Sequence, residues 1–390
     1  MSAPDLNVNL LIIGAGPFGL AMAAYAKHLG IDRVIVGKPM EFWIKNMPRG
    51  MYLRSTTDWH LDPVGIYTIE KFLETQGQKP ADVEPLTLQF YLSYAQWFQD
   101  KTQIQTLPLF IRRLDSVDGD DHYFQATTGD GQTIKASNVV IAPGFKYFKH
   151  LPTDLVARLP AARFSHTCDL IDFTDLKGKR CLIIGGRQSA FEWAALIHEA
   201  GAGAVHISYR HETPAFRAAD WTWVSELVEA MVENPNWFRQ LSQEKKDAVS
   251  RRLWAEGRLK VEPWLEARIM KDVVKLWPRT EVIACDVQPN GELEVKLSNG
   301  ETLLADHILM ATGYKAKIDS VPFLAQGNII SKLAVQNGFP VLDDHFQTNL
   351  PGLFITSMPA TQDFGPFFAF TVSVRTSAKL IGQAIAPWVA

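Results

Sequence analysis

A glycine-rich turn near the N-terminus, Gly14-Ala15-Gly16-Pro17-Phe18-Gly19, constrains this chain more than any other feature. It follows the apolar run 8–13, which is typical of a buried strand, and it precedes an apolar segment that predicts a helix ending before Gly30. In such a unit the first glycine makes the turn, the second admits a pyrophosphate, and the third lets helix and strand pack closely. The helix N-terminus adds free N–H groups and partial positive charge. The turn therefore predicts a dinucleotide site that includes Gly14, Gly16, Pro17 and Gly19.

A second unit of the same kind begins at Gly185. The apolar run 181–184 leads into Gly185-Gly186-Arg187-Gln188-Ser189-Ala190, and an apolar helix and the strand 204–209 follow. Each unit is followed by strand segments that close in a short turn, at Ala142-Pro143-Gly144 and at Ala311-Thr312-Gly313. Two such units are far more specific than one. The residues that we assign to the second nucleotide site are Gly185, Gly186, Arg187, Gln188, Ser189, Ala311, Thr312 and Gly313.

The order of these units predicts an α/β fold of two Rossmann-like dinucleotide-binding domains, with the second domain inserted into the first. Residues 1–165 form the first part of the first domain, 166–313 form the second domain, and 314–390 complete the first. Residues 219–277 predict a helical, tryptophan-rich insertion, which is longer than a βαβ connection needs. This insertion is either a substrate-facing cap or an extra packing layer.

The residues that would select the nucleotide depart from the usual pattern. Strand 204–209 ends in Tyr209-Arg210-His211 rather than in an acid, which favours NADPH over NADH because Arg210, helped by Arg217, suits a 2′-phosphate. The alternative is a solvated basic turn. Arg187 stands where a second glycine is expected, and it either blocks the pyrophosphate or turns outward to pair with a phosphate, which we favour. In the first unit Gly37 takes the place of the ribose-binding acid, and Glu41 is the nearest acid.

The chain resembles the flavin-dependent monooxygenases with two dinucleotide-binding domains, a group that includes N-hydroxylases. The resemblance covers nearly the whole chain and rests on both glycine-rich turns, on Ala311-Thr312-Gly313-Tyr314, and on the stretch 53–63 with the helix after it. It implies FAD on the first domain, with Glu41 and Trp43 among the residues beside it, and NADPH on the second. It also implies that O2 oxygenates a small organic substrate through a C4a-(hydro)peroxyflavin.

Departures from this family limit what the resemblance implies. The family has a glutamine beside the flavin where this chain has Arg54, and its lysine for an amino-acid carboxylate has no clear equivalent near Trp59 and His60. The Gly-Asp that holds the ribityl chain of FAD becomes Ser357-Met358. The cofactors therefore follow from the resemblance, whereas the substrate does not, and oxidation at nitrogen, sulfur, a ketone or a heteroaromatic carbon stays open.

Two distant stretches are expected to converge on the flavin ring. The irregular stretch 47–63 offers Arg54, Ser55 and His60 on a loop, and functional residues often lie on such loops. The strand that ends at Thr356 returns the chain to the first site and delivers Phe364-Gly365-Pro366, with a helix from there to the C-terminus. We expect Phe364, Gly365, Pro366, Arg54 and Ser55 to bind the cofactor. Arg54 is also a catalytic candidate that stabilises negative charge, and His60 is either a proton donor or a structural residue.

Composition excludes several function classes. A net charge of −3 gives no electrostatic case for nucleic acid, and the three cysteines lack metal-ligand spacing, so we expect no metal. Cysteine usage and the absence of a signal peptide or membrane span predict a cytoplasmic protein, and the oligomeric state stays open, a homo-oligomer included. Two alternatives to a monooxygenase are a non-oxygenating NADPH-dependent flavin oxidoreductase and a flavin-binding protein without turnover. The missing C-x-x-C excludes the disulfide version of the first.

Overall fold

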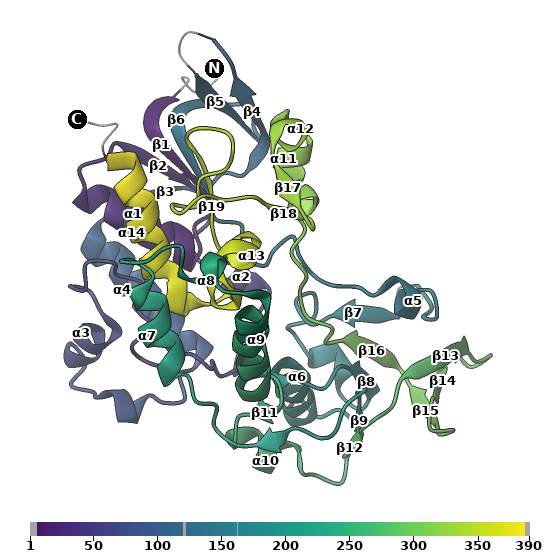
Figure 1. Cartoon of the computed structure of the whole chain (residues 1–390). Helices are drawn as coiled ribbons and strands as arrows, with labels where there is room; N and C mark the ends of the chain where they lie inside the picture. The colour runs from purple at the N-terminus through teal and green to yellow at the C-terminus, as the bar shows by residue number, and fades with distance from the viewer. Residues whose placement is uncertain (1–5, 120–121, 162, 387–390) are drawn as a thin grey trace.

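The computed structural model describes residues 6–119, 122–161 and 163–386, and it consists of two α/β halves (Figure 1). The first half contains a seven-stranded sheet in the order β3-β2-β1-β6-β5-β4, with β19 paired to the C-terminal part of β6. Its strands are β1 (Leu6–Ile13), β2 (Arg33–Val36), β3 (Thr106–Leu107), β4 (Ile111–Val117), β5 (Tyr123–Thr128), β6 (Thr133–Ile141) and β19 (Leu353–Ile355). Strands β1, β2, β3, β6 and β19 run parallel, whereas β4, β5 and β6 form an antiparallel meander.

Helices cover this sheet and bury large side chains. Helix α1 (Pro17–His28) joins β1 to β2 and packs along α14 (Val374–Ile385), and α2 (Glu41–Lys45) follows β2. Helix α3 (Ile69–Glu74) precedes α4 (Leu88–Thr102), which is capped by the Thr87 hydroxyl and buries Tyr91, Tyr94 and Phe98. These aromatics belong to the core of the first half.

The second half contains an all-parallel sheet in the order β12-β9-β8-β16-β7. Its strands are β7 (Phe164–His166), β8 (Arg180–Ile184), β9 (Ala204–Ser208), β12 (Val274–Trp277) and β16 (His307–Met310). Helix α6 (Gln188–Glu199) joins β8 to β9, and β13 (Val282–Val287), β14 (Leu293–Leu297) and β15 (Thr302–Ala305) form an antiparallel sheet beside them. Since the chain enters this half after β6 and returns to the first sheet at β19, the predicted α/β fold with an inserted second nucleotide unit is confirmed.

The tryptophan-rich insertion bridges the two halves. Its helices are α7 (Thr222–Ala230), α8 (Trp237–Gln240), α9 (Gln243–Gly257) and α10 (Trp264–Ile269). Side chains of α7, α8 and α9 join the core of the first half, whereas α10 packs into the core of the second, which favours the packing-layer alternative. The helical prediction is wrong for 274–277, because this segment is strand β12, whose Trp277 indole donates to His206 on β9 at 3.1 Å.

The C-terminal segment is less regular than expected. Short turns η4 (Met358–Ala360), α13 (Thr361–Phe364), η5 (Pro366–Ala369) and η6 (Thr371–Ser373) precede the long helix. The predicted helix from Pro366 is therefore wrong in its start, which lies at Val374, because the extended backbone at Phe370 interrupts the helix. Residues 387–390 lie outside the described part. The remaining short elements are η1 (Pro80–Asp82), α5 (Thr153–Val156), η2 (Thr174–Leu176), β10 (Ala215–Phe216), β11 (Lys260–Val261), η3 (Ile318–Ser320), α11 (Pro322–Ala325), α12 (Ile329–Lys332), β17 (Val335–Gln336) and β18 (Phe339–Pro340).

Candidate active site

The first glycine-rich turn lies where three parallel strands end together. The register places Ile13, Ile141 and Ile355 side by side, so the residues that follow them share one edge of the sheet. Gly14 has φ +113°, and a Cβ there would lie 2.3 Å from the carbonyl oxygen of Ala142. A Cβ on Gly19 would lie 1.8 Å from the carbonyl oxygen of Gly14, whereas a Cβ on Gly16 would meet nothing within 4 Å. Packing therefore requires the first and third glycines, and only Gly16 faces open space at the start of α1.

Two buried hydroxyls face the same edge without a partner. Thr356 and Ser357 directly follow β19 and are each 1% exposed, and their hydroxyl oxygens make no hydrogen bond with any described residue. Ser357 also has φ +67°, which costs a non-glycine residue about 1–3 kcal/mol. Buried polar groups are normally hydrogen-bonded, so these hydroxyls indicate a polar ligand. Together with the space at Gly16, they fit the ribityl and phosphate groups of FAD.

The structure explains why no acid ends β2. A Cβ on Gly37 would lie 3.0 Å from the backbone nitrogen of Ala15, so the first turn leaves little room for a side chain there. Glu41 begins α2, and its carboxylate pairs with Lys146 at 3.1 Å. Trp43, on the same helix, stacks on Tyr91 with ring centres 4.9 Å apart. The roles of Glu41 and Trp43 in binding FAD stay predictions.

The second turn repeats the packing of the first. A Cβ on Gly185 would lie 2.4 Å from the carbonyl oxygen of Ala311, the counterpart of Ala142. A Cβ on Gly186 would lie 2.4 Å from the Cβ of Tyr209, so this glycine serves close packing against β9. The Thr312 hydroxyl donates to the carbonyl of His150, which fixes the turn that closes β16. The structure therefore brings the predicted residues of the second site together at one sheet edge, where Gln188 and Ser189 are the first two residues of α6, just as Pro17 is the first residue of α1 at the other site.

The charged residues predicted for NADPH lie around this turn. The guanidinium of the half-buried Arg187 lies over the Trp254 ring of α9, 4.1 Å from its centre. The Gln188 side-chain oxygen accepts from the backbone N–H of Glu262 at 3.0 Å. Arg210 and Arg217 are exposed, and neither forms an ion pair with a described residue. Both are therefore free to meet a 2′-phosphate, and their selectivity for NADPH stays a prediction.

Arg54 is held by the second half of the molecule. Its Nε donates to Glu262 at 2.7 Å, one Nη donates to the carbonyl of Gly257 at 2.8 Å, and its guanidinium lies over Trp221. Glu262 is 6% exposed, so the ion pair is largely shielded from water. The structure thus gives Arg54 a structural role, and its catalytic role stays a prediction.

A second buried carboxylate holds the same loop. Glu192 on α6 accepts from the backbone N–H of Tyr52 at 3.2 Å and from Arg268 at 3.1 Å, and burial raises its pKa. The sequence analysis missed both Glu192 and Glu262. For Glu192 the signal was a carboxylate between Phe191 and Trp193 on an apolar helix, where a charged residue needs a partner.

The loop stretch expected at the flavin ring contacts η6, beyond the second expected stretch Phe364-Gly365-Pro366. The Ser55 hydroxyl lies 3.3 Å from that of Thr371 in η6. Phe364 is fully buried, and its ring stacks on Phe346 with centres 3.7 Å apart. A Cβ on Gly365 would lie 3.1 Å from the Phe238 ring of α8. Cofactor contacts by Phe364, Gly365, Pro366 and Ser55 stay predictions. The contact that the structure shows for the loop is the one between Ser55 and Thr371.

His60 is a neutral, half-buried imidazole. Burial, followed by the nearby Arg375 charge, lowers its pKa to about 3, and its Nδ1 accepts from the backbone N–H of Asp62 at 3.3 Å. It lines a cavity of about 350 Å³ between the loop, α7 and α14, whose charged lining is Asp62, Glu229, Glu233, Arg375 and Lys379. Because a neutral imidazole with this pKa releases no proton readily near pH 7, the geometry favours the structural alternative.

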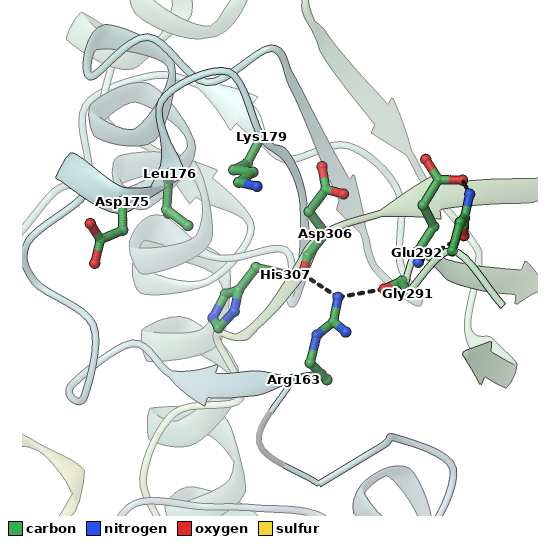
Figure 2. Close-up of a pocket in the computed structure, with 9 residues that line it drawn as sticks. Arg163, Asp175, Leu176, Lys179, Gly291, Glu292, Asp306 and His307 are labelled. Carbon is green, nitrogen blue, oxygen red and sulfur yellow. Dashed lines mark hydrogen bonds between the residues drawn. The ribbon is translucent and has the colours of Figure 1, made fainter. Parts of the chain in front are cut away.

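A second cavity, of about 370 Å³, lies at the edge of the second sheet that is opposite the second glycine-rich turn (Figure 2). Arg163 donates to the carbonyls of Gly291 and Asp306 there, and Lys179 and His307 also line it. These residues lie at the amino ends of β7, β8 and β16. Nucleotides bind at the carboxyl ends of such strands, so this cavity is separate from the dinucleotide site.

The cysteines are free, and burial raises the pKa of Cys168 to about 11 and that of Cys181 to about 12. Within 6–119, 122–161 and 163–386, no three His, Cys, Asp or Glu side chains group as a metal site. Across the same residues, every helix is too short or too polar to cross a membrane.

Comparison with known proteins decides the family. The family model for pyridine nucleotide-disulphide oxidoreductases matches residues 11–250. The chain belongs to this family. A CzcO-like uncharacterized oxidoreductase of Geobacillus kaustophilus (strain HTA426) is 24% identical over 286 residues, which cover 70% of this chain and 77% of that protein. Membership confirms the prediction of an oxidoreductase.

Solved structures confirm the fold. The ornithine N-hydroxylase KtzI of Kutzneria sp. 744, with reduced FAD, NADP+ and L-ornithine, has a TM-score of 0.81 at 16% identity and covers 98% of this chain and 100% of its own. The bacillithiol disulfide reductase Bdr (YpdA) of Staphylococcus aureus has a TM-score of 0.67 at 18% identity, covering 99% and 100%. The predicted resemblance to two-domain flavoprotein monooxygenases is confirmed at the level of the fold.

Proposed function

We propose that this protein is an FAD-dependent monooxygenase that oxidises NADPH and transfers one oxygen atom of O2 to a small organic substrate. The other oxygen atom leaves as water, with NADPH supplying two electrons and one proton and the solvent supplying the second proton. The observation that carries the proposal is the pair of glycine-rich turns at the carboxyl edges of two parallel sheets, with the 52–55 loop of the first half held by the second. The likeness to an N-hydroxylase with reduced FAD and NADP+ supports this cofactor pair.

The residues of the chain bind, orient and enclose the cofactors. Bound FAD would supply electron transfer and oxygen activation. The backbone at Gly16 and the first turn of α1 would hold its pyrophosphate, and the hydroxyls of Thr356 and Ser357 would donate to its polar groups. Trp59, which is 5% exposed and donates to Ser225 at 2.9 Å, closes the loop against α7 and would exclude water.

A non-oxygenating NADPH-dependent oxidoreductase is the second candidate, favoured by the description of the family and by the likeness to a disulfide reductase. Cys168 and Cys181 are buried in the second half, and Cys285 is half-buried on β13 of the same half. Reduction of a disulfide by a thiol beside the flavin is therefore the weaker interpretation. Free cysteines also fit the cytoplasmic location that we propose.

The test measures products together with NADPH use. The FAD-loaded protein is incubated with NADPH, O2 and a panel of amines, thioethers, ketones and heteroaromatic compounds. An oxygenated product formed in one-to-one ratio with NADPH, with label from 18O2, is expected for at least one class. Rapid NADPH oxidation that passes electrons to an acceptor without O2, and with no labelled product from any class, would favour the reductase.

A further inference from the structure

Two guanidinium groups meet at one exposed indole. Trp254 on α9 is 45% exposed, and the guanidinium of Arg187, the residue before α6, lies 4.1 Å from its ring centre. The guanidinium of Arg258, which directly follows α9, lies 5.5 Å from the same ring. The contact of Arg187 therefore joins the N-terminus of the second nucleotide helix to the insertion, to which Trp254 and Arg258 both belong.

The charges at this indole are not balanced by carboxylates. Arg187 and Arg258 are both half-buried, and neither is paired with a carboxylate of the described residues. Burial, and then the positive charge of Arg54, lower the pKa of Arg258. By contrast, Arg54 pairs with Glu262, and Arg252 on the same helix α9 approaches Asp220 at 3.7 Å. Two like charges that are partly removed from water are unfavourable unless an anion lies between or beside them.

The position of these charges identifies the anion. Arg187 is a member of the second glycine-rich turn and immediately precedes the twelve-residue helix α6, whose first N–H groups favour a phosphate. We propose that Arg187 and Arg258 together bind the pyrophosphate of the dinucleotide in the second half, with α9 closing over it. This inference rests on the proposed use of NADPH. It leaves Arg210, two residues after the end of β9, for the 2′-phosphate.

The proposal gives the insertion a role in dinucleotide binding. Arg54 of the first half donates to the carbonyl of Gly257, the last residue of α9. Arg258 therefore directly follows a residue that is hydrogen-bonded to the first half. A phosphate at Arg258 removes the repulsion between Arg258 and Arg54, and dinucleotide binding thereby tightens the contact between the two halves.

The experiment titrates the FAD-loaded protein with NADP+ and with NAD+ and measures Kd by calorimetry. Arg187→Ala and Arg258→Ala are each expected to raise the Kd of both dinucleotides by a similar factor, about tenfold, because each variant loses a charge-assisted contact to the pyrophosphate. Arg258→Lys is expected to recover part of the loss. Arg252→Ala is the matched control, since Arg252 lies on the same helix 4.2 Å from another indole, Trp223, and its variant should bind as the parent protein does.

The outcomes separate this inference from the proposed function. Parent-like Kd values in both Arg187→Ala and Arg258→Ala, with FAD content and melting temperature unchanged, would overturn the arginine assignment alone. Weaker binding of NADP+ but not of NAD+ would overturn the assignment of these arginines to the pyrophosphate and would assign them to the 2′-phosphate instead. If the FAD-loaded parent binds neither dinucleotide, the proposed function fails as well. Arg187→Ala tests the contact from the other element if Arg258→Ala does not fold.

Discussion

Replacing Gly16 by alanine should separate binding of FAD from folding. Gly16 has φ −81°, and a Cβ there meets nothing within 4 Å, so the unfolding free energy of the apoprotein should change by less than about 0.5 kcal/mol. The same methyl group enters the space that a pyrophosphate needs. In the parent protein, FAD at 100 times its Kd adds about 2.7 kcal/mol of stability, and Gly16→Ala should lose this increment.

Gly14→Ala is the matched comparison. Its side chain would require φ +113° and would lie 2.3 Å from the Ala142 carbonyl oxygen, so it combines about 1–3 kcal/mol of backbone strain with about 1–3 kcal/mol of overpacking. Thermal melts with and without added FAD check both variants. We expect a low melting temperature for Gly14→Ala in both conditions, and for Gly16→Ala a parent-like apoprotein without the FAD-dependent rise. A yellow Gly16→Ala protein with a normal rise would refute the placement of the pyrophosphate.

Three further predictions concern charged residues. Arg210→Ala should lose about tenfold of the preference for NADPH over NADH in flavin reduction, because a charge-assisted contact to the 2′-phosphate is lost; an unchanged preference would remove Arg210 from the site. His60 stays neutral in the folded protein, whereas in the unfolded chain it takes up a proton below about pH 6.5. The free energy of unfolding should therefore fall by up to about 2 kcal/mol between pH 7 and pH 5. Thermal melts at the two pH values should show a smaller difference for His60→Gln than for the parent protein. Arg54→Ala leaves the 6%-exposed Glu262 unpaired and should destabilise the protein by about 3–5 kcal/mol, and adding Glu262→Gln should restore most of this loss. A stable Arg54→Ala protein that only releases peroxide would instead support the catalytic role of Arg54.

The sequence predicts well what the local pattern determines. Both glycine-rich turns, the strands before them and the return of β19 follow from apolar runs, glycines and the order of elements. The sequence does not show that the four-residue segment ending at Trp277 forms the edge strand of a sheet. A strand this short is too brief to display the alternation of apolar and polar residues by which a strand is predicted. It also cannot show partners such as Glu262, because the contact with Arg54 depends on how two distant segments meet.

The ion pair between Arg54 and Glu262 also bears on the order in which the molecule assembles. These residues are 208 positions apart in the chain, and Tyr52 and Glu192 are 140 apart. Contacts that close such long loops form only after much of the chain entropy between them has been lost. The return strand β19 pairs with β6 across a similar separation, since Leu353 and Val139 are 353 − 139 = 214 positions apart. We therefore expect docking of the 52–54 loop onto α6 and onto the residue after β11 to belong to the same late stage of folding as the completion of the first sheet. A variant that lacks these carboxylates would then accumulate as a species with two formed sheets and an undocked loop, in which neither dinucleotide site is complete.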